Sequence, residues 1–424
     1  MALELRRGLS PAREALSNGA VLLVQQTSMA PAVTIDCVFD AGSLCDPADR
    51  PGVSQLLGRV LDRGTLRRSA SALSDALDDR GVALRVSTTR HRLSVSCTCL
   101  SEDFADVLAI LLDVARRPTF PASDIEQQRA ETVTALRQDD DNPAVRALDA
   151  VAGLIYGADH PYARKAKGHV ASVERIRRED LQAFHAAWVR PSCLTLAVVG
   201  DVEPAVAMSL AAAELEDWSA PPAEHVPVTP PPAPAVRRIE RLAMPGKSQS
   251  DITYGFNTIR RLDPRYYAYW MMNNVLGQFG LGGRLADNIR ERQGMAYYAY
   301  STFDASVGEG PLIVRAGVDP ANVARTIEAI DREVRTLAAE GPTATEVAET
   351  REYLVGSIPR LLENNPGIAA FLLTTEQYGL GLDYDRRLPA LIRAVTADDI
   401  HAAAQSLDPG AASIAVAGPL DPTR

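Results

Sequence analysis

Hydrophobic and polar positions follow two different periods along this chain. Residues 20–25 and 32–40 are rich in Val and Ile with partial alternation, a pattern typical of half-buried strands. Residues 102–116 place their apolar side chains on one helical face, which predicts a strongly amphipathic helix. The same criteria predict helices over 51–63, 70–79, 124–138 and 178–187 and strands over 85–87, 94–100 and 195–199, with Ser123 as the N-cap of the helix at 124. Clusters of strands with helix pairs between them indicate an α+β fold in which helices cover one face of each sheet.

The order of these patterns recurs in the second half of the chain. The stretches RQDDDNPAVRALDAVAGLIYG and LLENNPGIAAFLLTTEQYG both contain a polar run, Asn-Pro, an apolar helix and Tyr-Gly. Asn142 and Asn365 occupy matching positions, and so do Gly200 and Gly418 near the ends of the two halves. Because the order is kept at a nearly constant offset, we interpret the chain as two homologous copies of one fold.

A proline-rich stretch separates the two copies. Residues 218–238 contain too many prolines for a helix or a central strand, which favours an extended, semi-rigid connector. We therefore expect an N-terminal domain over 1–217, a linker over 218–238 and a C-terminal domain over 239–424.

Composition narrows the range of partners. The chain has 424 residues, 46% apolar and 23% charged, which is typical of a globular protein of two or three domains. Its formal net charge of −10 argues against nucleic acid as the main partner. No apolar stretch approaches the roughly 20 residues of a membrane helix, and the first residues lack the apolar region of a secretory signal. We expect a cytoplasmic protein without a membrane partner, or a periplasmic one if a leader has been removed.

Candidate chemistry is sparse when it is judged from residue types alone. The predicted helix in PGVSQLLGRVLDRGT carries Gly58 in its interior, at a cost of roughly 1 kcal/mol relative to alanine, and Arg59 beside it. No two of the six histidines lie three to five positions apart, so no helix offers a ready zinc pair. The glycine-rich stretch 277–285 does not fit a nucleotide-binding fingerprint, and we interpret it as a turn before a helix. These observations predict no cofactor.

Five segments in order nevertheless resemble the pitrilysin–insulysin family of zinc peptidases, which includes the mitochondrial processing peptidase. They are residues 16–26, 39–65, 160–202, 281–303 and 395–420. The resemblance runs through nearly the whole chain and implies two homologous domains, each a sheet covered by helices, in a clam-shell arrangement.

The resemblance also implies where zinc would bind in an active member. The first helix of such peptidases carries H-x-x-E-H, with two zinc-binding histidines and a glutamate that deprotonates the attacking water. The matching positions here are Gln55 and Arg59 for the histidines and Gly58 for the glutamate; Ala135 stands at the distal ligand and Gln128 at an earlier glutamate. Glycine and alanine offer no ligand atom, and arginine is a permanent cation. We therefore expect a degenerate site that binds no catalytic zinc.

A second set of residues implied by the resemblance is retained. In active members, an Arg and a Tyr seven residues apart in the second half contact the substrate near the metal. The matching residues are Arg290 and Tyr297, which would hydrogen-bond to the scissile carbonyl and stabilise the developing oxyanion. Arg290 is alternatively a surface residue paired with Asp287, and Tyr297 a half-buried strand residue.

Neighbouring residues complicate this assignment. A slipped alignment would exchange the predicted pair for Arg292, Tyr298 or Tyr300. The spacing between Arg290 and Tyr297 favours these two.

The resemblance leads to one favoured function and two alternatives. We expect the non-zinc, substrate-binding subunit of a heterodimeric zinc peptidase, whose zinc lies in a homologous partner with H-x-x-E-H and whose substrate is a peptide. An alternative is an inert structural or assembly subunit, like the core proteins of the respiratory cytochrome complex. A third reading is an independent hydrolase that uses Ser or Cys.

Overall fold

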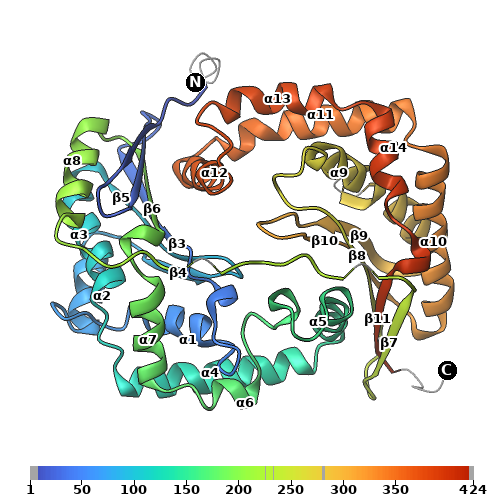
Figure 1. Ribbon diagram of the computed structural model, residues 1–424, viewed down its shortest axis with the longest axis horizontal. Coiled ribbons are helices and arrows are strands. Elements are labelled where there is room, and N and C mark those ends of the chain that lie inside the picture. Colours follow the sequence, from blue (N-terminus) through green and yellow to red (C-terminus); the bar gives the residue numbers. More distant parts are fainter. Residues whose placement is uncertain (1–7, 225, 233, 279–281, 420–424) are drawn as a thin grey trace. The chain divides into compact units, whose positions relative to one another are not determined.

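Two mixed sheets organise the chain (Figure 1). The structure, a computed structural model, describes residues 8–224, 226–232, 234–278 and 282–419. Its contacts define two compact units, the first composed of Met1–Leu136, Lys165–Val226 and Pro359–Arg386 and the second of Arg137–Arg164, Pro227–Ile358 and Arg387–Arg424. The predicted α+β class is confirmed, since each unit combines one sheet with helices packed against it.

The first unit contains a six-stranded sheet of order β1-β2-β6-β3-β5-β4. Its strands are β1 (Ala12–Ala15), β2 (Val21–Gln26), β3 (Ala32–Phe39), β4 (Arg85–Thr88), β5 (Leu93–Leu100) and β6 (Leu194–Gly200). Strands β2 and β6 are parallel and the other neighbours antiparallel. The predicted strands match within two residues, because alternation in β5 and the apolar runs of β3 and β6 report directly which faces are buried.

Helices of the first unit pack around this sheet. They are α1 (Val53–Val60), α2 (Ala70–Asp78), α3 (Phe104–Arg116), most of α4 (Ala122–Asp140), α6 (Val170–Val173), α7 (Arg178–Trp188), α8 (Pro204–Leu215) and α12 (Asn365–Gln377). The prediction of Ser123 as an N-cap is wrong. Helix α4 already includes Ser123, whose hydroxyl donates to the Asp124 carboxylate (3.1 Å). The helix begins directly after Pro121, where a fixed backbone φ favours a helical start.

The second unit contains a five-stranded sheet of order β7-β11-β8-β10-β9. Its strands are β7 (Arg238–Ala243), β8 (Ser250–Asn257), β9 (Ala296–Phe303), β10 (Pro311–Val318) and β11 (Ser413–Gly418). Its helices are α5 (Pro143–Tyr156), α9 (Tyr266–Asn273), α10 (Val323–Glu340), most of α11 (Ala344–Leu361), most of α13 (Tyr384–Ala394), α14 (Ala397–Gln405) and two π-helical segments, η5 (Asn274–Gln278) and η6 (Ala286–Arg292). Strand β9 therefore forms one edge of this sheet.

Two helices lie in the unit that their position in the sequence would not suggest. Helix α5, from the first half of the chain, packs on β8 and β11, and α12, from the second half, packs on β3 and β6. The predicted arrangement with helices on one face is thus incomplete, since α12 covers the face opposite α3 and α8 (Figure 1).

The exchanged helices have the same local design, as the predicted repeat requires. Asn142 caps α5 through its side chain and Asn364 caps α12, each with a proline in the first turn. Both helices end at a tyrosine that precedes a glycine with positive φ.

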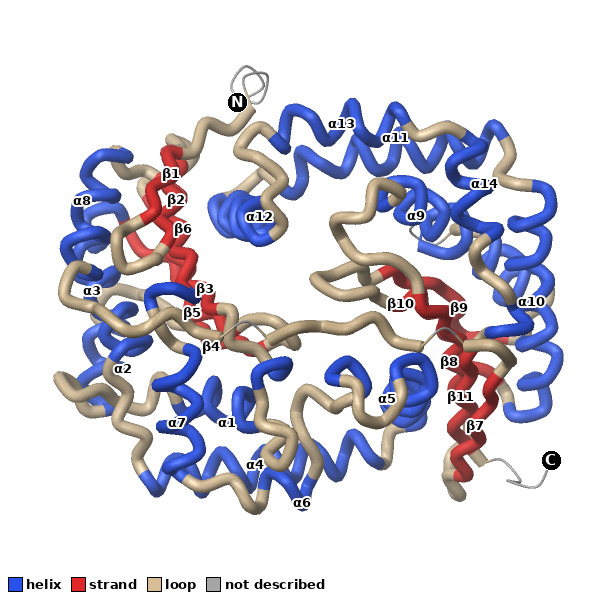
Figure 2. Tube along the Cα trace, in the orientation of Figure 1, coloured by secondary structure: helices blue, strands red, loops and turns tan. Residues whose placement is uncertain are grey.

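Short 3-10 turns and loops connect the elements. The turns are η1 (Ser43–Cys45), η2 (Ser101–Asp103), η3 (Pro161–Ala163), η4 (Pro191–Cys193), η7 (Pro320–Asn322) and η8 (Pro409–Ala411). The proline-rich stretch contains no regular secondary structure where it is described (Figure 2). Among the described helices, none has both the length and the apolar character that a membrane span requires.

Candidate functional site

Helix α1 is held in place by its ends and by one apolar face. Its N-cap is Gly52, at φ +99, where a Cβ atom would lie 2.7 Å from the carbonyl oxygen of Lys167. The Asp46 carboxylate accepts from the amides of Gly52 (2.6 Å) and Ser54 (3.0 Å), which satisfies the start of the helix. Leu56 and Leu57 are fully buried in the core of the first unit. Glycine and aspartate thus define where this helix begins.

The positions that correspond to a zinc ligand and its general base face Thr88, at the end of β4. The Gln55 side-chain amide donates to the Thr88 carbonyl oxygen (2.8 Å). A Cβ atom on Gly58 would lie only 2.5 Å from Thr88 Oγ1, and that hydroxyl donates to the Ser54 carbonyl oxygen (3.3 Å). The space that a glutamate would need at position 58 is therefore occupied by the threonine. No feature of the sequence pointed to Thr88.

The remaining positions of this set are equally unsuited to zinc. Arg59 is exposed and has no ion pair within the described part of the chain. Ala135 contributes a half-buried methyl group, and Gln128 is buried. An amide that is already hydrogen-bonded, two residues without ligand atoms and a cation do not fit Zn²⁺. Across the described residues, no three His, Cys, Asp or Glu side chains come together as a metal site.

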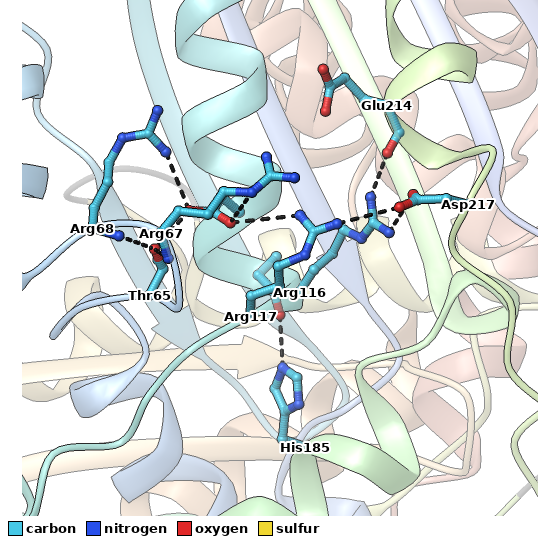
Figure 3. A network of polar contacts seen from close by, with 10 residues as sticks. Thr65, Arg67, Arg68, Arg116, Arg117, His185, Glu214 and Asp217 are labelled. Carbon is cyan, nitrogen blue, oxygen red and sulfur yellow. Dashed lines mark hydrogen bonds and ion pairs between the residues drawn. The ribbon is translucent and has the colours of Figure 1, made fainter.

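The loop that follows α1 is fixed by a buried carboxylate (Figure 3). Asp113 on α3 is 1% exposed and accepts from Thr65 Oγ1 (2.6 Å) and the Arg68 guanidinium (3.2 Å). Arg67 and Arg117 lie 3.8 and 3.6 Å from its other oxygen. Three guanidinium groups around one buried carboxylate are a structural arrangement, since they compensate the cost of its burial.

This network extends towards the end of α8. The Arg116 guanidinium donates to the Glu214 carbonyl oxygen and to Asp217, both at 2.5 Å (Figure 3). Hydrogen bonding to Arg116 lowers the pKa of Asp217. The polar groups behind α1 thus join three elements of the first unit to one another.

Arg290 lies on the π-helical segment η6 of the second unit. Its guanidinium donates to the neighbouring Glu291 carboxylate (2.7 Å) and its side chain is 31% exposed. The alternative pairing with Asp287 is wrong, because Asp287 instead pairs with Arg292 (2.6 Å). Arg290 is therefore solvent-accessible, with an exposed acid as its partner.

Tyr297 occupies a special position on the edge strand β9. In the pairing of β9 with β10, Tyr298 lies opposite Gly317 and Ala296 opposite Val318, so Tyr297 is the extra residue of a β-bulge. Its side chain is 74% exposed and has no hydrogen-bond partner within the described residues, and the half-buried alternative is wrong. Its phenol is an available donor.

The segment between the glycine-rich stretch and β9 is anchored to other parts of its unit. Arg284 donates to both oxygens of Glu346 (2.7 and 2.8 Å) and to the Gly341 carbonyl oxygen (3.1 Å). Asn288 donates to Glu333 on α10. The central residues of the stretch, 279–281, lie outside the described residues, so its predicted turn is described only at its ends.

Fold and site together define a class of protein. Two α+β repeats, each with its own sheet, and a first helix that keeps the frame of a zinc-binding helix without its ligands, are the features of a peptidase-like protein with a degenerate metal site. Family models match two parts of the chain: "Insulinase (Peptidase family M16)" over residues 21–157 and "Peptidase M16 inactive domain" over residues 175–354. The chain belongs to peptidase family M16.

Individual relatives agree with this assignment. A Streptomyces coelicolor protein named an uncharacterized zinc protease is 25% identical over 96% of this chain and 89% of its own length. A Helicobacter pylori protein named a non-peptidase homolog is 23% identical over 90% of this chain and 87% of its own. The crystal structure of a peptidase M16 inactive domain from Pseudomonas fluorescens superposes with a TM-score of 0.91, at 25% identity, over 97% of this chain and 99% of the other. The recognised family is thus confirmed, and relatives with both kinds of name share the full-length fold.

Proposed function

We propose that this chain is the substrate-binding, non-zinc subunit of a heterodimeric zinc peptidase that acts in the cytoplasm. Its partner is a homologous subunit with an intact H-x-x-E-H motif, which holds the zinc. Arg290 and Tyr297 of this chain reach the partner's site and donate hydrogen bonds to the scissile carbonyl of a peptide. The net charge of −10 favours basic or neutral peptides as substrates.

The exposed phenol of Tyr297 carries this proposal. A large aromatic side chain that is 74% exposed, without an internal hydrogen bond in the described structure, is available to a ligand. It lies in a bulge, a device that re-aims side chains and is frequent next to active sites. The two other tyrosines that a slipped alignment would select are less available, since Tyr298 donates to Asp251 and the Tyr300 ring lies against the Arg315 guanidinium.

An inert structural subunit is the second candidate. The degenerate helix α1 and a relative named a non-peptidase homolog both suit this role. It differs from the first proposal in giving no task to Tyr297.

Turnover by the assembled enzyme separates these candidates. The tagged chain is purified from its source cells with bound proteins, and any H-x-x-E-H homologue is then co-expressed with it and assayed on a quenched fluorescent library of basic and neutral decapeptides. Tyr297→Phe should lower kcat about 100-fold with little change in KM, as expected when one oxyanion donor is lost. Arg290→Ala should have a similar effect.

Arg292→Ala is the matched control. Arg292 lies two residues from Arg290 and is 73% exposed, in a surface ion pair, so turnover should be unchanged. Equal turnover in the wild type and Tyr297→Phe would favour the structural subunit. An absence of any H-x-x-E-H partner would remove the proposal.

A further inference from the structure

The bulge of β9 stands beside a row of three residues that crosses three strands. Tyr298 on β9 lies opposite Gly317 on β10, and Gly317 lies opposite Asp251 on β8. The Tyr298 ring passes over Gly317, and its hydroxyl donates to the Asp251 carboxylate on the far strand. An edge strand is thus tied to the strand beyond its immediate neighbour.

This row requires a glycine at its centre. A Cβ atom at position 317 would lie 2.5 Å from Cε1 of the Tyr298 ring, closer than atoms can approach without displacing the ring. Gly317 has no left-handed φ, so its role here is to leave room for the ring. The absence of a side chain is what allows the phenol to reach Asp251 across β10.

Asp251 is well placed to hold the phenol. It is 5% exposed, and the side-chain amide of Gln249 donates to both of its oxygens (3.4 and 3.3 Å). Burial and the hydrogen bond to Asp251 both raise the pKa of Tyr298, so the phenol keeps its proton and remains a donor. A hydrogen bond from a neutral donor to a buried carboxylate is among the stronger ones in proteins.

The row lies directly beside the unpaired residue of the bulge. A bulged edge strand has lost part of its ladder and is locally easier to open than a regular strand. Tyr297 has no other contact by which its direction is held, since its own hydroxyl is free within the described structure. Its orientation therefore depends on the residues that fix the backbone on either side of it.

We propose that Tyr298 and Asp251 are positioning residues, which clamp β9 beside its bulge and thereby aim Tyr297 at the substrate. This inference rests on the proposed function of Tyr297. Neither residue touches the substrate, and both act through the backbone of the bulge.

Hydrogen exchange on the isolated chain tests the clamp without a partner. In Tyr298→Phe, which keeps the ring over Gly317 and removes only the hydroxyl, amides 296–299 should exchange about tenfold faster, since a hydrogen bond to a charged group contributes on the order of that factor. Asp251→Asn is the conservative variant, which keeps an acceptor oxygen and should show a smaller increase. Tyr300→Phe is the control, because the Tyr300 hydroxyl has no hydrogen bond among the described residues.

Turnover by the assembled enzyme tests the positioning role. Tyr298→Phe should lower kcat about tenfold and leave KM unchanged, because a misaimed donor loses transition-state contacts rather than substrate affinity. Unchanged exchange in Tyr298→Phe, or faster exchange with unchanged kcat, would overturn the inference. Tyr297→Phe separates the two levels: unchanged turnover in that variant removes the proposed function and the positioning role with it, whereas a loss there with none in Tyr298→Phe removes only the positioning role.

Discussion

Helix α1 of the first unit and the η6–β9 segment of the second differ in how their polar groups are used. On α1, the Gln55 amide is bonded to the end of β4, and Thr88 fills the space beside Gly58. On β9, the Tyr297 phenol is exposed and has no partner in the described structure. The first region satisfies itself, whereas the second retains an unused donor.

This difference indicates where chemistry can remain in a chain whose metal site has degenerated. A former catalytic helix that still starts at a capped glycine and buries Leu56 and Leu57 has become scaffold. A strand edge whose bulge keeps an aromatic donor in solvent gains nothing in stability from that donor. Exposed groups without internal partners are therefore better candidates for function than positions inherited from a motif.

The strongest test of the scaffold side is the removal of its buried carboxylate. Asp113→Ala leaves the guanidinium groups around it without their charge partner and should lower the free energy of unfolding by about 3–5 kcal/mol. Urea denaturation measures this loss. Asp106→Ala, which removes a 68% exposed carboxylate from the same helix, is the control and should cost less than about 1 kcal/mol. Similar losses in both variants would contradict a structural role for the network.

Acidification probes the hairpin that carries Thr88. Burial lowers the pKa of His91 to about 4, with smaller contributions from Arg90 and Arg92. Because the folded pKa lies below the unfolded value of about 6.5, the unfolded chain takes up a proton first as the pH falls. Stability should therefore be complete above about pH 6.5 and decline by on the order of 3 kcal/mol as the pH falls towards 4.

His91→Gln isolates this contribution from that of other groups. The pKa of His185 is also lowered by burial and contributes with the same sign, so the quantity of interest is the difference between the two pH profiles. Denaturant midpoints between pH 7 and pH 4.5 measure it. Parallel profiles in the wild type and His91→Gln would show that His91 is not buried as a neutral imidazole.

Gly58→Ala gives a smaller effect with a decisive sign. In an open helix this change stabilises by up to about 1 kcal/mol. Contact of the new Cβ with Thr88 Oγ1 should outweigh that gain and destabilise the chain by about 1–2 kcal/mol, as overpacking does. In the double variant with Thr88→Ala, the alanine at position 58 should become neutral or stabilising. A stabilising effect in the single variant would show that the position is open.

Much of the fold could be predicted because burial leaves a periodic trace in the sequence. The alternation of β5 and the amphipathic face of α3 gave element bounds within two residues of those observed. The repeat of Asn-Pro and Tyr-Gly correctly marked α5 and α12 as equivalent helices. Their exchange between units could not be predicted, because a helical period shows that a face is buried but not against which sheet.

The site was predictable only as far as residue identities carry. Gln55, Gly58 and Arg59 are legible in the sequence as poor zinc ligands, but the reason that Gly58 stays small lies on β4, some thirty positions away. Similarly, the sequence Ala-Tyr-Tyr-Ala-Tyr does not reveal which tyrosine is bulged. The distinction between Tyr297 and Tyr298 arises from cross-strand pairing with Gly317 and Asp251, which no local pattern contains.

Photo-crosslinking compares the two regions most directly. A benzoylphenylalanine is placed at position 297 or at position 59, both exposed, in the complex with the H-x-x-E-H partner, and a biotinylated peptide cleaved by that complex is added before illumination. We expect the peptide to be captured at position 297 at least several-fold more than at position 59, with unlabelled peptide competing. Capture at position 59 that equals or exceeds capture at position 297 would contradict the claim that Tyr297 contacts the substrate.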